Sequence, residues 1–163
     1  MFGFLKKKKE EVGNEVICAP VKGKAVESKE VNDPTFGEEM LGAGMAILPS
    51  EGKVYSPVDG KVSMCIDSNH AVGIMSNQGT ELLIHIGLDT VSLKGQHFTP
   101  HMKEGDEVKK GDLLIEFDME AIKAAGFEVI TPVIVTNSFD FKEVIRFTGK
   151  DVEVGDAVME IVK

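Results

Sequence analysis

The feature that most constrains the fold of this chain is a succession of short Val- and Ile-rich runs separated by Gly, Pro, Asp and Asn. Alternation of β-branched runs with turn-forming residues is typical of an all-β protein. Hydrophobic residues make up 42% of the chain, which is enough to bury a core at a length of 163 residues. The pattern predicts strands at residues 15–19, 23–28, 44–49, 52–55, 60–67, 71–76, 81–86, 112–117, 129–135 and 157–162.

Two stretches depart from the strand pattern and predict short helices. In each, an aspartate stands where it can cap the first turn and a glycine stands where the helix would end. One of them also has a proline, whose fixed φ suits the first turn of a helix. The predicted helices are residues 35–41, between Asp33-Pro34 and Gly42, and residues 118–125, between Asp118 and Gly126.

Internal repeats indicate how the strands are organised. Residues 19–26 (APVKGKAV) match residues 56–63 (SPVDGKVS), and residues 105–116 match residues 149–160 through a shared Val-x-x-Gly-Asp turn. A single strand–turn unit of this size cannot bury its apolar face alone, so two copies are expected to pack together. The repeats therefore predict an antiparallel β-sandwich, or flattened barrel, with internal symmetry and a few short helices.

The length predicts one domain with a tail: a flexible N-terminal tail at residues 1–14 and a single domain at residues 15–163. The net charge is -9, and residues 1–9 contain four lysines and no acid, so the remainder carries -13. An acidic body would repel nucleic acid and would attract a basic protein partner. The tail is either solvated or makes weak, reversible contact with a membrane surface through Met1–Lys9.

The sequence also predicts a location for the protein. No apolar run approaches the roughly 18 residues of a spanning helix, and the N-terminus is not a secretory signal. Two cysteines, Cys18 and Cys65, cannot form a disulfide framework, which favours the reducing cytosol. We expect a cytoplasmic protein whose tail allows a peripheral position at the inner face of the membrane. Met1 and the short lysine tail favour a freestanding chain over a piece of a longer fused protein.

Two of the four histidines stand out by their spacing. His70 and His85 flank the turn signal Ser76–Thr80, and a hairpin whose loop is Asn77-Gln78 or Ser76–Gly79 places the two histidines directly opposite each other. Opposed side chains have Cβ atoms about 4.5–5.5 Å apart, whereas a slip of one residue would send them to opposite faces. His97 and His101 have no such context and are expected to be exposed loop residues.

Paired imidazoles suit two kinds of chemistry. A neutral imidazole, with an unperturbed pKa of about 6.5, can take a phosphoryl group on one nitrogen while the second imidazole donates a hydrogen bond to the phosphoryl oxygens. Alternatively, two histidines are half of a tetrahedral zinc site. No third ligand is evident, because Ile74 and Gly87 occupy the positions where a zinc peptidase of related fold would have aspartate and histidine. We therefore expect no metal and no cofactor.

The segments around these histidines resemble a known family. Ser68-Asn-His-Ala71 and residues 82–95 (LLIHIGLDTVSLKG) are similar to the signature of the glucose-family enzyme IIA of the bacterial phosphoenolpyruvate-dependent sugar phosphotransferase system. The resemblance covers residues 16–163 and implies an antiparallel β-sandwich that carries phosphoryl groups. It implies that His85 accepts a phosphoryl group on Nε2 from the phosphocarrier protein HPr. The group then passes to the IIB domain of a glucose-type sugar permease.

The resemblance also implies roles for neighbouring residues. His70 would hydrogen-bond the phosphoryl group, Ser68 would be a candidate relay, and the carbonyl of Gly87 would orient the His85 ring through Nδ1. Two acids would meet arginine on HPr, and an apolar ring would dock the partners. The acids are Asp33 and Asp89, and the apolar ring is Phe36, Met40, Leu41, Ile66 and Leu83.

Two other functions remain open on the sequence alone. One is a zinc-dependent hydrolase with a duplicated hammerhead fold, for which the ligand set is incomplete. The other is a non-catalytic docking module, since relatives of the family regulate transporters and kinases through the same face. Such regulatory targets are compatible with a phosphoryl-carrier role. For the apolar side chains the alternative is burial in an ordinary core, above all for Met40 and Leu41.

Overall fold

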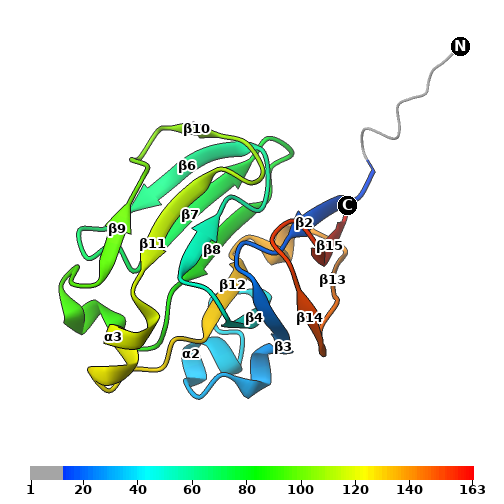
Figure 1. Ribbon diagram of the computed structural model, residues 1–163. Coiled ribbons are helices and arrows are strands. Elements are labelled where there is room, and N and C mark those ends of the chain that lie inside the picture. Colours follow the sequence, from blue (N-terminus) through cyan, green and yellow to red (C-terminus); the bar gives the residue numbers. More distant parts are fainter. Residues whose placement is uncertain (1–12) are drawn as a thin grey trace, which may run out of the picture.

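The computed structural model describes residues 13–163 and shows strands packed in layers with short helices at their edges (Figure 1). The predicted membrane contact of Met1–Lys9 lies outside the described residues. Every strand pairing in the described part of the chain is antiparallel. No helix in this part of the chain is long and apolar enough to cross a membrane.

The largest sheet has eight strands in the order β10-β6-β7-β8-β12-β4-β3-β14. The second sheet has the order β5-β11-β9, and the third has the order β13-β15-β2. This arrangement confirms the predicted antiparallel β-sandwich. The strands are β2 (Glu15–Cys18), β3 (Gly23–Glu27), β4 (Ala43–Pro49), β5 (Lys53–Tyr55), β6 (Gly60–Cys65), β7 (Ala71–Ser76), β8 (Glu81–His85), β9 (Phe98–Pro100), β10 (Glu107–Val108), β11 (Leu113–Phe117), β12 (Thr131–Val135), β13 (Glu143–Arg146), β14 (Lys150–Val152) and β15 (Ala157–Val162).

The two internal repeats fold into matching structures. The backbone N–H of Ala19 donates to the carbonyl of Asp156 at 2.7 Å, and the matching Ser56 donates to Asp112 at 2.8 Å. Each aspartate side chain also accepts a hydrogen bond, at 2.8 Å, from the backbone N–H three residues before it. The shared Gly-Asp turn is therefore closed in the same way in both copies, which confirms the predicted internal symmetry.

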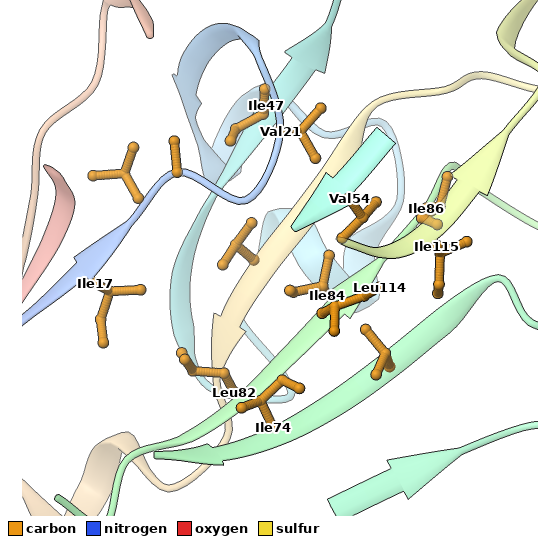
Figure 2. Close-up of a cluster of buried hydrophobic side chains, with 14 of the residues drawn as sticks. Ile17, Val21, Ile47, Val54, Ile74, Leu82, Ile84, Ile86, Leu114 and Ile115 are labelled. Atoms are coloured by element: carbon orange, nitrogen blue, oxygen red, sulfur yellow. The ribbon is translucent and has the colours of Figure 1, made fainter. Parts of the chain in front are cut away.

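The core is contributed by all three sheets, as the cluster in Figure 2 shows. Ile74, Leu82 and Ile84 of β7 and β8 are fully buried with Leu114 and Ile115 of β11. Burying an aliphatic side chain of this size stabilises the fold by roughly 1.5–3 kcal/mol. In β8, Leu82 and Ile84 face this core, so Leu83 and His85 point to the other face of the strand.

A second, smaller hydrophobic cluster lies on the outer face of the large sheet. The helices α2 (Pro34–Gly37) and η1 (Ser28–Glu30) lie against this face, and Phe36 of α2 is buried in the cluster. Leu83 of β8 packs against it. The cluster fixes the α2 segment close to the end of β8. Its buried members are Val26, Val31, Phe36, Ala46, Leu88, Ile130 and Ile134.

The structure corrects several predicted boundaries. The predicted helix at residues 35–41 is wrong in extent, since α2 ends at Gly37 and Glu39 has a left-handed φ of 55°. The helix predicted at residues 118–125 is observed as α3 (Met119–Ala124). The short strands β9, β10, β13 and β14 were missed by the sequence analysis. The remaining helical segments are η2 (Thr90–Leu93) and η3 (Ser138–Asp140).

Candidate functional site

The two histidines singled out by the sequence lie together at the end of β8. The ring centroids of His70 and His85 are 4.8 Å apart and the rings meet edge to face, at 81°. The ring of Phe36 lies 4.8 Å from the ring of His85 on a different element, α2. Because α2 and β8 are both held by the outer hydrophobic cluster, the packing of the sheet positions the His85 ring between two aromatic neighbours.

The register that led to this prediction is wrong by one residue. Ala71, not His70, lies directly opposite His85, because the hairpin loop closes with Ser76 opposite Thr80. His70 nevertheless reaches His85, because it stands just outside the regular pleat of β7. It follows Asn69, which has a left-handed φ of 56° and turns the chain before the strand begins. The contact is confirmed, but the alternation argument does not explain it.

The tautomer of His85 follows from its hydrogen bond. Nδ1 of His85 lies 2.8 Å from the carbonyl oxygen of Gly87, which can only accept. Nδ1 therefore carries the proton, and the lone pair of the neutral ring is on Nε2. Burial lowers the pKa of His85, while the Gly87 hydrogen bond and the charges of Asp33 and Asp89 act in the opposite direction. These three groups stabilise positive charge on the ring.

His70 is the more enclosed of the two histidines and is neutral at physiological pH. Its exposed fraction is 5%. Burial, together with the proximity of His85, lowers the pKa of His70 to about 4. The hydroxyl oxygen of Ser68 lies 2.8 Å from Nδ1 of His70. If the hydroxyl donates to Nδ1, the single ring proton of His70 is on Nε2.

Gly87 has a backbone conformation that a side chain would not tolerate. Its φ is 78°, and a Cβ at this position would lie 2.6 Å from the carbonyl oxygen of Glu128. Its N–H donates to the carbonyl of Ile130 at 3.0 Å, just before β12. The carbonyl that holds His85 is therefore on a residue fixed by close packing against the neighbouring chain segment.

The two predicted acids flank the site from different loops. Asp33 caps α2 by accepting a hydrogen bond from the N–H of Thr35 at 2.9 Å. Asp89 has a left-handed φ of 59° at the turn that leads into η2, and its side chain is exposed. Both contribute a favourable charge at His85, so the structure brings them to the site as expected.

The predicted apolar ring divides into buried and exposed members. Phe36 is buried, whereas Met40 and Leu41 are 69% and 43% exposed. The alternative that Met40 and Leu41 belong to an ordinary core is therefore wrong. They stand on the turn after α2 rather than on one helical face. Ile66 and Leu83 are half-buried.

The remaining histidines, His97 and His101, are both exposed and lie outside the strands, as predicted. Nε2 of His101 lies 2.8 Å from a carboxylate oxygen of Glu116. Among residues 13–163, no group of three or more His, Cys, Asp or Glu side chains is placed to hold a metal ion.

One buried polar residue beside the site was not singled out by the sequence analysis. Thr90, the first residue of η2, is fully buried, and its hydroxyl donates to the carbonyl of Ile86. A threonine at the start of a short helix commonly bonds a nearby carbonyl. Its place in the run Asp89-Thr90-Val91, directly after the histidine motif, was the signal that could have found it.

Comparison with known proteins agrees with this architecture. The family model for the phosphoenolpyruvate-dependent sugar phosphotransferase system, EIIA 1, matches residues 15–141. The PTS system glucose-specific EIIA component of Halalkalibacterium halodurans is 42% identical over 166 residues, which cover 100% of this chain and 96% of that protein. The solved structure of glucose permease IIA from Mycoplasma capricolum superposes with a TM-score of 0.82, at 35% identity over 98% of this chain and 99% of that one.

A longer relative contains the same unit as one part. The PTS system beta-glucoside-specific EIIBCA component of Halalkalibacterium halodurans is 48% identical over 149 residues, or 91% of this chain. The matched region is 23% of that relative, so the chain spans about a quarter of its length. With the β-sandwich and its histidine pair, these similarities define a component of a sugar phosphotransferase system. The chain belongs to the EIIA 1 family of that system. These similarities to known proteins give no support to the alternative of a zinc hydrolase.

Proposed function

We propose that this chain is a phosphohistidine carrier, which accepts a phosphoryl group from HPr on Nε2 of His85 and passes it to the IIB domain of a glucose-type sugar permease. The observation that carries the proposal is the 2.8 Å hydrogen bond from Nδ1 of His85 to the carbonyl of Gly87. This bond fixes the proton on Nδ1 and leaves the Nε2 lone pair available as a nucleophile.

The transfer exchanges one N–P bond for another. The Nε2 lone pair of His85 attacks phosphorus while the N–P bond to the donor histidine breaks, and the donor ring recovers its electron pair. The His85 ring becomes cationic as the new bond forms. The Gly87 carbonyl and the carboxylates of Asp33 and Asp89 are the groups that favour this charge, and they raise the pKa of the ring for the same reason.

His70 is proposed to stabilise the phosphoryl oxygens. Its pKa of about 4 keeps it neutral, so at pH 7 it can offer one N–H to the phosphoryl oxygens. The Ser68 hydroxyl, 2.8 Å from Nδ1, is proposed to hold the tautomer in which Nε2 is the donor. Ser68 would then position His70, and its hydroxyl remains the candidate relay expected from the sequence.

The partner proteins are proposed to dock on the surface around the histidine pair. Met40 and Leu41 are exposed and Ile66 and Leu83 are half-buried. Their apolar side chains are proposed to contact the partners. The carboxylates of Asp33 and Asp89 would meet arginine side chains on HPr, which would steer association. Regulatory target proteins would use the same surface.

The proposed carrier unit is residues 15–163, preceded by a tail at residues 1–14. Its place of action would be the cytoplasm, where the IIB domain of a permease is accessible. A labelled phosphoryl donor chain of phosphoenolpyruvate, enzyme I and HPr provides the test. The unmodified protein should acquire label and pass it to a IIB domain. His85→Gln should acquire none, whereas His97→Gln, which changes an exposed histidine away from the pair, should be labelled as the parent is. Labelling of His85→Gln would refute the assignment.

A further inference from the structure

The peptide unit that precedes Gly87, the residue whose carbonyl orients His85, is held in place by the hydroxyl of Thr90 at the start of η2. Thr90 is 0% exposed, and its hydroxyl donates to the carbonyl of Ile86 at 2.5 Å. Ile86 directly precedes Gly87, so this hydrogen bond acts on the peptide unit that joins the two residues. The N–H of the same peptide unit donates to the carbonyl of Ile130 at 3.0 Å. The plane of this peptide is therefore fixed at both its oxygen and its nitrogen.

The methyl group of Thr90 also lies against Gly87. A Cβ built on Gly87 would be 2.7 Å from Cγ2 of Thr90, so the threonine side chain occupies the space beside the glycine. Gly87 has a φ of 78°, and its carbonyl must turn back to reach Nδ1 of His85 within the same short turn. The two ends of the Thr90 side chain thus restrain the peptide unit before Gly87 and the Cα of Gly87 itself.

We propose that Thr90 is a positioning residue for the phosphoryl-accepting histidine: its buried hydroxyl fixes the Ile86–Gly87 peptide, so that the Gly87 carbonyl keeps the proton of His85 on Nδ1. The inference rests on the proposed function of His85. A neutral imidazole with its proton on Nε2 has no lone pair on that nitrogen, so each molecule in the wrong tautomer is inactive as an acceptor.

The hydroxyl, rather than the methyl group, is the part assigned this role. The Ile86 carbonyl is buried beside Thr90, and a buried carbonyl that loses its donor favours any rotation that finds another partner. Rotation of the Ile86–Gly87 peptide would alter the direction of the chain at Gly87 and lengthen the bond to His85. Packing by the methyl group limits this rotation but does not replace the hydrogen bond.

A matched pair of variants separates the two contributions. Thr90→Val keeps the shape and removes the hydroxyl, whereas Thr90→Ser keeps the hydroxyl and removes the methyl group. The ¹⁵N chemical shifts of the His85 ring, measured at pH 8 without any phosphoryl donor, report the tautomer directly. We expect the Nδ1–H tautomer to remain dominant in the parent and in Thr90→Ser, and to give way to a mixture in Thr90→Val. The maximal rate of acceptance from HPr should fall roughly three- to tenfold in Thr90→Val, with an unchanged half-saturating HPr concentration.

The outcomes distinguish this inference from the proposed function. If Thr90→Val keeps the Nδ1–H tautomer of His85 as the parent does, the positioning role is overturned. The role is also overturned if Thr90→Ser loses this tautomer to the same extent as Thr90→Val. Absence of phosphorylation in the parent overturns the proposed function and leaves the tautomer result intact. If Thr90→Val does not fold, the hydroxyl proton of Thr90 in the parent decides the question. It should exchange slowly with water and show a nuclear Overhauser effect to the N–H of Gly87. Rapid averaging with water would overturn the role.

Discussion

Replacing His70 should change how the stability of the protein depends on pH. Burial beside His85 lowers the pKa of His70 to about 4, whereas an unperturbed histidine has a pKa of about 6.5. Below pH 6.5 the unfolded chain binds a proton at this position that the folded protein excludes. The contribution of this pKa difference to the free energy of unfolding is therefore fully present above pH 6.5 and is lost as the pH falls toward 4. At about 1.36 kcal/mol for each unit of pKa, the full effect is about 3 kcal/mol, of which about 2 kcal/mol is lost by pH 5.

Urea unfolding at pH 7.5, 6.5, 5.5 and 5.0 provides the assay. His70→Gln removes this titration, so its unfolding free energy should fall by about 2 kcal/mol less than that of the parent between pH 7.5 and pH 5.0. His97→Gln changes an exposed loop histidine and should retain the parental pH dependence. Carboxylates are unchanged in all three proteins, so only the difference between proteins is interpreted. Equal pH dependence in the parent and in His70→Gln would refute the conclusion that His70 is held neutral by burial.

Three further results are expected. His70→Gln should still accept phosphoryl groups on His85 but should discharge to a IIB domain roughly ten- to several-hundredfold more slowly, timed with the isolated phosphoprotein; discharge at the parental rate would make His70 merely structural. Gly87→Ala should destabilise the protein by about 1–3 kcal/mol beyond Gly79→Ala in urea unfolding, because a Cβ at Gly87 would lie 2.6 Å from the carbonyl oxygen of Glu128, whereas a Cβ at Gly79 would meet nothing within 4 Å. Equal losses would contradict the close packing at Gly87. The double variant Asp33→Asn, Asp89→Asn should accept phosphoryl groups from HPr more slowly at low salt, and its rate should depend less on salt. The fold should be kept, because asparagine can still cap α2 at position 33. An unchanged rate would show that the two charges do not contribute to the transfer from HPr.

The sequence predicted the architecture well, because the repeats and the strand pattern each specify a local structure. The turns of the repeats carry their own closing residues, such as Asp112 and Asp156, so they form the same hydrogen bonds in both copies. The missed strands are short: β10 has two residues, β9 and β14 have three each, and β13 has four. Strands of this length carry too little alternation to be detected, and they exist because a longer neighbouring strand pairs with them.

The site was predicted in composition but not in all of its geometry. The pairing of His70 with His85 depended on a register that was wrong by one residue, and the left-handed Asn69 restored the contact. The sequence pattern of this loop does not predict a left-handed φ at Asn69. The exposure of Met40 likewise follows from the left-handed Glu39, which ends α2 early and which a helical pattern cannot reveal. Both deviations are decided by how the loops pack on the sheet.

The most direct test of the proposed mechanism is to find which atom carries phosphorus. Protein labelled with ¹⁵N-histidine and phosphorylated through phosphoenolpyruvate, enzyme I and HPr should give a phosphorus resonance with a one-bond coupling to a single ring nitrogen. The hydrogen bond from Nδ1 of His85 to Gly87 predicts that this nitrogen is Nε2 of His85, with the Nδ1 resonance uncoupled. Coupling to Nδ1 of His85, coupling to His70, or phosphorus bound to an oxygen of Ser68 would contradict the proposed mechanism.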